Sequence, residues 1–345
     1  MSERRPRVMQ SFKPPRPTTN PYITMLDRAL AAESRFEHLN FSWREALLTR
    51  VDVLHLHWPE VMLEGSTAWK RWGKRVLMRV LLAKHRLTGG AIVRTVHNVE
   101  LPQDVDSATR RILVAIEERT DHRVVLNDST PTADPSATTL IPHGHYRDWF
   151  ASYEHADRVA GQIGYFGLIR RYKGIETLLA VYERARDQDD TLSLRVGGRP
   201  SSPALADTVS AASARVPRIT ATLRFLEDAE LVEIATSSQL VVLPYRFMHN
   251  SGGALASLSL DRPVLLPRND VNEALGVEIG PGWVHLYDGE LTADRLRTAM
   301  DATRDVTGSP DLSRREWSAV GQRHAAAYRK AVLHRKHATN RNSRG

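Results

Sequence analysis

The chain has 345 residues, no cysteine and a formal net charge of +8, with 41% hydrophobic and 26% charged residues. These values exclude a disulfide framework, and no apolar run of roughly 18 residues or more is present that could span a bilayer. The N-terminal MSERRPRVMQSF lacks the apolar stretch of a secretory signal, so we expect a cytoplasmic protein of two domains. Its basic surface suits partners that carry phosphate.

Short apolar runs alternate twice along the chain with segments of helical periodicity, which predicts an α/β fold with two parallel sheets. The predicted strands of the first half are RVMQSF, VDVLHLHW, AIVRTVH, HRVVLN and TTLIPH. Those of the second half are QIGYFG, LSLRVGG, TATLRF, QLVVLP and PVLLP, with helices expected over 174–186 and 228–237.

The polar stretch ASYEHADRVAG separates the two series of strands and predicts the domain boundary. We therefore expect domains over 1–158 and 159–312. A final helix is predicted over 313–334, and the polar, basic residues 335–345 predict a disordered tail.

Loops after the strands are the places to search for chemistry, because open parallel sheets bind ligands at the carboxyl ends of their strands. The loop after the first strand, PPRPTTNPY, offers four side chains that could contact an acceptor: Thr18, Thr19, Asn20 and Tyr22. Its prolines equally suit a plain rigid turn.

The segment HLHWPE ends the second predicted strand. Strand alternation places His55 and His57 on one side of the sheet. An imidazole such as that of His57, or the carboxylate of Glu60, could take a proton from an acceptor hydroxyl. The alternative is a hydrogen-bonded histidine under a loop.

Three further histidines follow later strands. His97 lies in TVHN, where Asn98 and Glu100 only shape the turn, while His143 and His145 flank a glycine in IPHGHY. We expect one of the latter two to bind ligand and the other to pack. Since the sequence has neither an H-x3-H helix nor cysteine partners, we expect no metal site.

The segment WKRWGKRVLMRVLLAKHR, residues 69–86, carries seven lysines or arginines and no acid. One predicted helical face holds Trp69, Trp72, Val76, Val80 and Ala83. Such a helix suits an anionic membrane surface, on the inner face of the membrane for a cytoplasmic protein. The alternative is a helix that packs this face on its own sheet.

In the second half, Asn250, Ser251, Gly252 and Gly253 interrupt two apolar runs where the strand QLVVLP should give way to a helix. A helix that begins near Ser251 would point free N–H groups at an anion, and the glycines would let a phosphate approach the backbone. The alternative is a glycine-containing turn with a serine N-cap.

The segment GYFGLIRRYKG places Gly167 directly after a strand and sets Arg170, Arg171 and Lys173 before a helix. Cations at this point can neutralise a diphosphate leaving group as its bond to a sugar breaks. At least one of the three could instead belong to a solvated basic loop.

Together, GYFGLIRRYKGIETLL, LSLRVGG, FLEDAELVEIATSSQLVVLPY and SGGALASLSLDRPVLLP resemble the C-terminal half of group 1 glycosyltransferases, the family 4-like branch of the GT-B fold. The match covers roughly residues 161–267, while TVHN and IPHGHY resemble less distinctive segments of the acceptor domain. The resemblance implies two Rossmann-like domains facing across a cleft, with the sugar nucleotide held mainly by the second. It also implies a C-terminal helix that crosses back to the first domain.

By this resemblance, Arg170 and Lys173 contact the donor diphosphate, the turn from Ser251 to Gly253 caps it, and His97 reaches the transferred sugar. Gly167, Tyr245 and Asn250 are further candidates for donor binding. Many relatives carry two glutamates seven residues apart at this helix, and here those positions fall near Met248 and at Ala256. Neither ribose recognition nor the retaining or inverting outcome therefore follows from the resemblance.

We expect a metal-independent glycosyltransferase that needs no cofactor and moves a hexose from a nucleoside-diphosphate sugar to a glycan or a lipid-linked acceptor. GDP-mannose is the favoured donor, with a UDP-sugar as the other choice, because HLHWPE and the SGG turn are similar to bacterial polysaccharide mannosyltransferases. The alternatives are a sugar-nucleotide epimerase of the same fold and a basic nucleic-acid-binding protein. Nucleic acid is not expected as a partner, since basic residues are spread evenly and no stacked-aromatic pattern is present.

Overall fold

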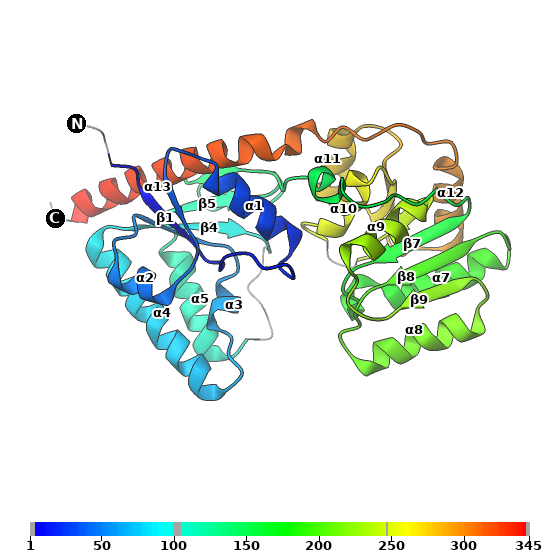
Figure 1. Ribbon diagram of the computed structural model, residues 1–345, viewed down its shortest axis with the longest axis horizontal. Coiled ribbons are helices and arrows are strands. Elements are labelled where there is room, and N and C mark those ends of the chain that lie inside the picture. Colours follow the sequence, from blue (N-terminus) through cyan, green and yellow to red (C-terminus); the bar gives the residue numbers. More distant parts are fainter. Residues whose placement is uncertain (1–3, 99–104, 246–247, 343–345) are drawn as a thin grey trace. The chain divides into compact units, whose positions relative to one another are not determined.

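The computed structural model describes residues 4–98, 105–245 and 248–342, and it divides into two compact units. Unit 1 comprises Met1–Gly144 and Arg315–Gly345, and unit 2 comprises His145–Arg314. Each unit is built on a six-stranded parallel sheet flanked by helices (Figure 1). The predicted α/β class with two Rossmann-like domains is confirmed.

The sheet of unit 1 has the strand order β2-β1-β3-β4-β5-β6. Its strands are β1 (Arg7–Gln10), β2 (Glu37–Leu39), β3 (Val53–Leu56), β4 (Ala91–Val96), β5 (His122–Val125) and β6 (Thr138–Leu140). Five of them coincide with predicted strands, whereas β2 was not predicted. The two residues Met9 and Ile92 flank Leu54 in the register, so apolar side chains from three strands align on one face.

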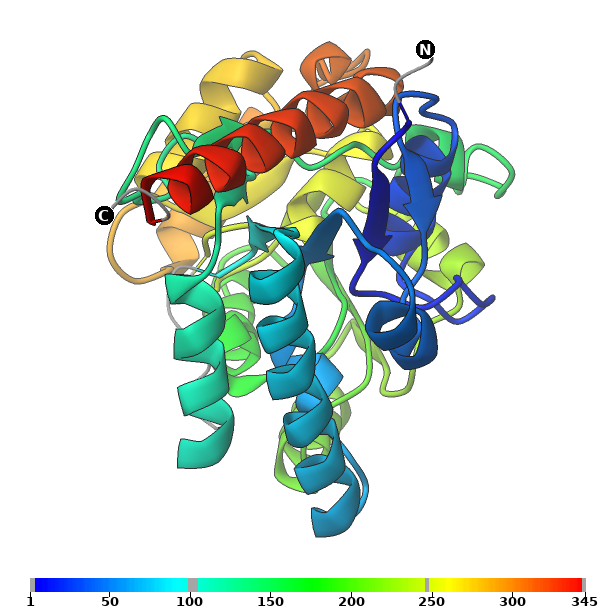
Figure 2. The same cartoon turned by 90° about the vertical axis from the view of Figure 1, so that its left-hand side faces the viewer.

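Helices cover both faces of this sheet. They are α1 (Pro21–Ala31), α2 (Trp43–Leu48), α3 (Pro59–Leu63), α4 (Ala68–Thr88), α5 (Ser107–Glu118) and α13 (Val320–Asn342). Leu54, Leu56 and Ile92 pack with α4 and α5 in the hydrophobic core. Figure 2 shows these two helices below the sheet and α13 along its other face, where α13 contacts β3, β4 and β5.

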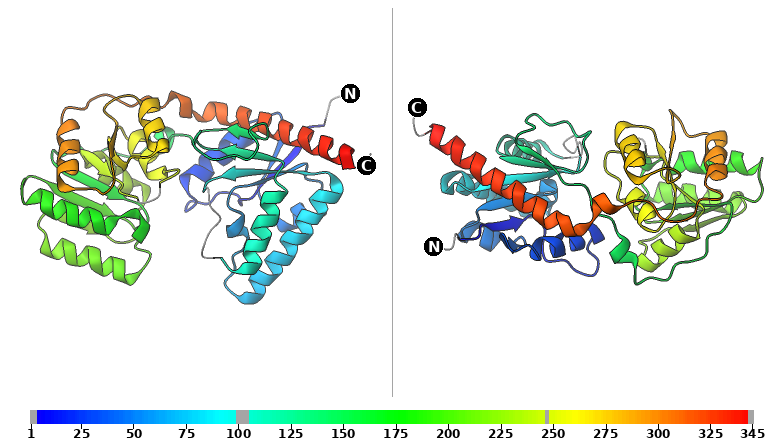
Figure 3. Two further views of the ribbon diagram at one scale, coloured as in Figure 1. Left: turned by 180° about the vertical axis from the view of Figure 1, so that it is seen from behind. Right: turned by 90° about the horizontal axis from the view of Figure 1, so that it is seen from above.

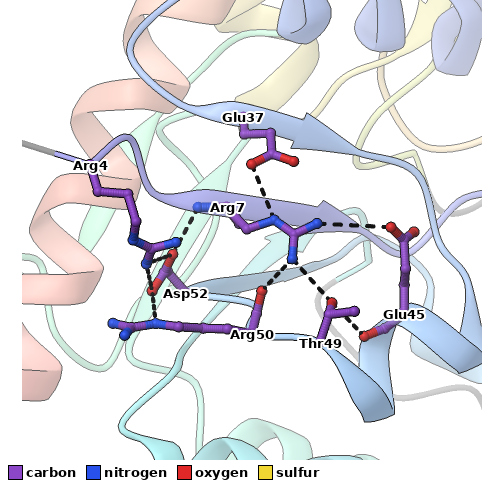
Figure 4. Close-up of polar contacts among 7 residues, drawn as sticks. All are labelled: Arg4, Arg7, Glu37, Glu45, Thr49, Arg50 and Asp52. Atoms are coloured by element: carbon purple, nitrogen blue, oxygen red, sulfur yellow. Dashed lines mark hydrogen bonds and ion pairs between the residues drawn. The ribbon is translucent and has the colours of Figure 1, made fainter.

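A polar cluster anchors the amino end of β1 (Figure 4). The Arg7 guanidinium donates to Glu37 at 3.1 Å, to the Thr49 hydroxyl at 3.1 Å and to the Arg50 carbonyl at 2.9 Å. The Asp52 carboxylate accepts the backbone N–H of Arg7 at 2.9 Å. These contacts join β1 to β2 and to the start of β3, at the end of the sheet opposite the candidate ligand-binding loops.

The sheet of unit 2 has the order β12-β11-β10-β7-β8-β9, and Figure 3 shows it from behind. Its strands are β7 (Gln162–Phe166), β8 (Ser193–Gly197), β9 (Ile219–Thr222), β10 (Leu240–Val242), β11 (Val264–Pro267) and β12 (Val284–Tyr287). Its helices are α6 (Arg147–Phe150), α7 (Ile175–Arg186), α8 (Pro203–Arg215), α9 (Asp228–Ser237), α10 (Gly252–Ser259), α11 (Asp270–Ile279) and α12 (Ala293–Ala302). Five strands were predicted, and β12 was not.

The structure divides the chain at residues 144 and 145, earlier than the predicted boundary after 158. The backbone N–H of Tyr146 donates to the Ser259 hydroxyl at 2.9 Å, and the Trp149 indole donates to Asp228 at 2.8 Å. Because these bonds tie the segment to α10 and α9, it belongs to unit 2.

The end of the chain also differs from the prediction. The last helix spans Val320–Asn342, so much of the segment 335–345 that was predicted as a disordered tail is helical. That segment holds no proline and no glycine before Gly345, and such residues are what would stop a helix. Residues from Arg315 onward belong to unit 1.

Helix α4 does not bury the face that its sequence suggested. Its buried residues are Met78, Leu81, Leu82 and His85, at the i, i+3, i+4, i+7 spacing of a core-facing stripe. By contrast, Trp69, Trp72, Val80 and Ala83 are exposed. The alternative in which that face packs on the sheet is therefore wrong for these four residues.

Candidate functional site

The candidate donor site of unit 2 lies at the carboxyl ends of β7 and β10. A 3-10 turn, Arg171–Lys173, follows Gly167, and the Lys173 Nζ lies 4.8 Å from the ring centre of Tyr245. The same Nζ would be 3.8 Å from a Cβ placed on Gly167, so the two residues are neighbours. Burial, with a smaller contribution from the charge of Arg170, lowers the pKa of Lys173 to about 8.

The amino end of α10 adjoins this lysine through Tyr245. Ser251 is the N-cap of α10, and its hydroxyl accepts the N–H of Ala254 at 3.1 Å. A Cβ on Gly253 would lie 3.4 Å from the Tyr245 hydroxyl. The first N–H groups of a helix have no partner within the helix, so a positive end faces the same place as Lys173.

Two glycines allow the loops of this site to pack backbone against backbone. Gly198, after β8, has φ +148, and a Cβ on it would lie 1.7 Å from the carbonyl oxygen of Gly167. Gly174, after the 3-10 turn, has φ +69, and its Cβ would lie 2.2 Å from the carbonyl oxygen of Pro244. The loops after β7, β8 and β10 are thus held in close contact at positions where a side chain cannot fit.

Contacts link four of the candidate donor residues of unit 2: Gly167 with Lys173, Lys173 with Tyr245, and Tyr245 with Gly253. Arg170 precedes the 3-10 turn that holds Lys173, and Asn250, Ser251 and Gly252 directly precede Gly253 in the chain. The side chains of Arg170 and Arg171 are exposed. Ala256 and Met248 are buried and carry no carboxylate, so the paired glutamates of many relatives have no counterpart at these positions.

Unit 1 gathers a second group of side chains at the carboxyl ends of β3 and β4. The rings of His55 and His57 lie 4.2 Å apart between centroids, which confirms that both project to one side of the sheet. His97 stacks on Trp58 with a centroid separation of 3.8 Å and an interplanar angle of 16°. The ring centre of His57 is 5.8 Å from that of His97.

Tyr22 joins this group to β6. Its ring centre lies 5.8 Å from that of His97 and 4.2 Å from that of His143. The cluster therefore draws on α1, β3, β4 and the segment after β6. Aromatic faces with ring nitrogens between them suit the apolar and polar sides of a sugar acceptor.

The histidines of this cluster are neutral at pH 7. Burial, with repulsion from His324, lowers the pKa of His57 to about 3, and burial lowers that of His143 to about 4. Burial and the neighbouring histidines hold the pKa of both His55 and His97 well below the usual value. A neutral imidazole keeps a lone pair on one ring nitrogen, so these rings can accept a proton, although a pKa this far below 7 makes them weak bases.

Glu60 lies in the first turn of α3 and is partly buried. Burial raises the pKa of its carboxyl, an effect that the charge of Arg94 opposes. A carboxylate with a raised pKa is a second candidate base, on the element that directly follows His57.

Several other predicted acceptor residues have local structural roles. The Asn20 side chain caps α1 by accepting the N–H of Tyr22 at 2.9 Å, and the Thr19 hydroxyl accepts the N–H of Arg16 at 2.8 Å. His145 is buried in unit 2 and accepts the N–H of Arg147 at 3.3 Å. Glu100 lies outside the described residues.

Sequence reasoning missed four buried residues that contact His55 or His57: Gln10, Thr95, His324 and Tyr328. Their hydrogen bonds and ring contacts reach His55 and His57. Two signals could have found them. Gln10 is a polar residue in an otherwise apolar strand, and His324 and Tyr328 lie four residues apart on one face of the final helix.

Within the described part of the chain, no three histidine or acidic side chains lie where they could together hold a metal ion. Among the same residues, no helix combines the length and the apolar character that crossing a bilayer requires.

Comparison with known proteins identifies relatives of similar sequence. No protein-family model matches the chain. The chain is 44% identical over 329 residues to the GDP-mannose:glycolipid 4-beta-D-mannosyltransferase of Xanthomonas campestris pv. campestris, across 94% of this chain and 92% of that protein. A second sequence of the same name and pathovar is 43% identical over the same length.

Solved structures share the fold at low sequence identity. HepE of Anabaena in complex with UDP-glucose has a TM-score of 0.58 at 12% identity, covering 98% of this chain and 100% of that one. Sucrose-phosphate synthase from Thermosynechococcus elongatus has a TM-score of 0.56 at 14% identity, covering 99% of both chains.

Proposed function

The chain belongs to the family of the GDP-mannose:glycolipid 4-beta-D-mannosyltransferases, which are glycosyltransferases of the GT-B fold, and from this we propose that it transfers mannose from GDP-mannose to a glycolipid. The observation that carries the proposal is the 44% identity along 94% of the chain. The adjacency of Gly167, Lys173 and the amino end of α10 supports it, since a diphosphate needs such donors.

The proposed reaction inverts the anomeric centre. The relatives' name specifies a β-linked product, and the mannose of GDP-mannose is α-linked, so a single displacement accounts for the change. Such a displacement needs a base for the acceptor hydroxyl. The neutral histidines at the end of β3 and β4, His57 and His97, and the carboxylate of Glu60 are the groups proposed for the acceptor side.

We propose that the donor side works without a divalent metal or another cofactor. Lys173, Arg170 and the amino end of α10 supply positive charge where the diphosphate would carry negative charge as it leaves. Since these charges belong to the protein, transfer is expected to persist in EDTA.

Incubation of the purified protein with GDP-[14C]mannose and glycolipids that end in different sugars tests this proposal. We expect label in one lipid fraction, a β-1,4 linkage by NMR, no transfer from labelled UDP-glucose, and equal rates with Mg²⁺ and with EDTA. Absence of transfer from GDP-mannose to every glycolipid would contradict the function, and loss of transfer in EDTA would contradict the metal-free mechanism.

A glycolipid acceptor also requires access to a membrane, and we propose α4 as the contact. Trp69 and Trp72 stack at 4.7 Å between ring centroids and are 74% and 52% exposed, among seven basic residues over 69–86. Aromatic rings at headgroup depth with cations around them suit an anionic bilayer surface. The protein would then be peripheral on the inner face of the membrane.

Replacement of Lys70 and Arg71 by alanine is expected to weaken binding to phosphatidylglycerol vesicles by about 10- to 30-fold, because each cation near an anionic surface contributes about 1 kcal/mol. Co-sedimentation measures this, with Arg44→Ala/Arg184→Ala as the control of equal charge change on exposed sites elsewhere. Equal losses of vesicle binding in both double variants would show non-specific attraction. Unchanged vesicle binding after replacement of Lys70 and Arg71 would exclude α4 as the membrane contact.

A further inference from the structure

A continuous set of hydrogen bonds passes through the core of unit 1. Its members are 2% exposed or less: Gln10, His55, His57, Thr95 and Tyr328. His55 contacts the Thr95 hydroxyl through Nε2 and the Tyr328 hydroxyl through Nδ1, both at 2.8 Å. The Gln10 amide then joins the Tyr328 hydroxyl to His57, with 3.1 Å on each side.

The Gln10 amide determines which nitrogen of His57 carries the hydrogen. Its Nε2 donates to Tyr328, so its Oε1 is the atom that faces Nε2 of His57. A carbonyl oxygen only accepts, and therefore His57 Nε2 must be the donor. Since His57 is neutral, its lone pair is on Nδ1.

The remaining bonds agree with this direction. The Tyr328 hydroxyl accepts from Gln10 and has its own hydrogen left for Nδ1 of His55. His55 then donates from Nε2 to Thr95, so both of its nitrogens are used. Within the described residues, Nδ1 of His57 is buried and has no hydrogen-bond partner.

This lone pair lies among the rings proposed for the acceptor side. His57 follows β3, and its ring centre lies 6.0 Å from that of Trp58 and 5.8 Å from that of His97. A buried acceptor atom without a partner is destabilising, and a bound hydroxyl group would remove that cost. Both ring nitrogens of His55 are hydrogen-bonded, whereas Nδ1 of His57 has no partner among the described residues.

We propose that Gln10 and Tyr328 are positioning residues for mannosyl transfer, which hold His57 in the tautomer whose Nδ1 takes the proton of the acceptor hydroxyl. The inference rests on the proposed function and deepens it. The acceptor oxygen bonds to C1 of mannose, the bond from C1 to the diphosphate oxygen breaks, and its electron pair leaves with GDP. The hydroxyl proton passes to Nδ1, while Gln10 keeps its bond to Nε2–H.

Tyr328 makes this arrangement depend on the C-terminal helix. It lies on α13, with its ring 5.1 Å from Phe36 and 5.5 Å from His55, both in T-shaped contacts. Gln10 and Tyr328 are 318 positions apart in the sequence. Packing of α13 on the sheet therefore completes the base, in addition to filling the core.

Nitrogen-detected NMR of protein labelled with 15N-histidine tests the tautomer directly, with the His57 signal assigned by its loss in His57→Asn. We expect Nε2 protonated and Nδ1 bare in the wild type, and a mixture of tautomers in Gln10→Leu and Tyr328→Phe. Tyr182→Phe is the matched control, because it removes a buried hydroxyl that donates to a backbone carbonyl in unit 2.

Kinetics give the second readout. Gln10→Leu and Tyr328→Phe are expected to lower kcat by about 10- to 100-fold with the KM for GDP-mannose unchanged. Gln10→Glu would place a carboxylate against the imidazolium and move the acid limb of the pH–rate profile to higher pH. The other titratable groups that face His57 are His55, His97 and His324.

The outcomes separate the inference from the proposed function. A wild-type His57 with Nδ1 protonated, or an unchanged kcat and acid limb in all three variants of an active enzyme, overturns the positioning roles. An inactive wild type overturns the function, while the tautomer measurement still reports on the network. If Gln10→Leu fails to fold, Tyr328→Phe and Gln10→Glu carry the test.

Discussion

Replacement of Arg170 and Lys173 by alanine is expected to lower kcat for mannosyl transfer by about 100- to 1,000-fold. The reason is that the diphosphate gains negative charge as it leaves the sugar, and preorganised cations stabilise that charge most in the transition state. Lys173 is held against Tyr245 beside Gly167, so it is already in place before the donor binds. Initial rates with saturating GDP-mannose measure the effect.

Arg184→Ala is the matched control for this prediction. Arg184 is an exposed arginine near the far end of α7, the helix that follows Lys173, and its removal changes the charge of the same unit. We expect its kcat to equal that of the wild type. An active double variant, or an equal loss in the control, would contradict the assigned role of the cations.

Lowering the pH from 7 to 5.5 is expected to destabilise the protein by at least about 3 kcal/mol, because each buried histidine contributes roughly 1 kcal/mol over this interval. Three of the buried histidines contribute to this figure: His55, His57 and His324, each less than 4% exposed. Burial lowers the pKa of His57 to about 3 and that of His324 to about 4, and burial and neighbouring histidines hold the pKa of His55 well below its usual value.

The sign follows from which state binds protons first. The unfolded histidines titrate near pH 6.5, whereas the folded ones resist protonation until about pH 4 or below. The stabilisation is thus complete above about pH 6.5 and is lost as the pH falls toward 4. Urea unfolding at both pH values measures the free energy of unfolding. In His324→Asn the slope of this free energy against pH should decrease by the contribution of one proton. A free energy of unfolding that stays constant or rises on acidification would refute the prediction.

The sequence predicted most strands of both sheets because parallel, buried strands consist of unbroken apolar runs. It missed β2 and β12, which are short edge strands with mixed residues such as EHL and VHLY. Their positions depend on backbone pairing with Val8 and Leu265, which local composition does not reveal. The boundary was misplaced for a similar reason, since α6 is fixed to unit 2 by Trp149 and Asp228, which are far apart in sequence.

The candidate donor residues could be predicted from the sequence because a glycine turn and a cationic loop are contiguous motifs. The relatives are named mannosyltransferases, which agrees with the predicted transferase and not with the alternative of an epimerase. The residues that hold the proposed base, His57, could not be predicted from the sequence. Gln10 and Tyr328 come from opposite ends of the chain and meet only when α13 packs on the sheet. The exposed face of α4 was also ambiguous, because Trp69 and Trp72 suit a core and a membrane surface equally.

The proposed transfer requires a diphosphate to bind beside Gly167, Lys173 and the amino end of α10. Calorimetric titration with GDP and with GMP tests this directly, since the two ligands differ only by the outer phosphate. We expect GDP to bind roughly 100-fold more tightly than GMP, and Arg170→Ala/Lys173→Ala to abolish the difference. Equal affinities of the wild type for GDP and GMP, or no binding of either, would contradict the account.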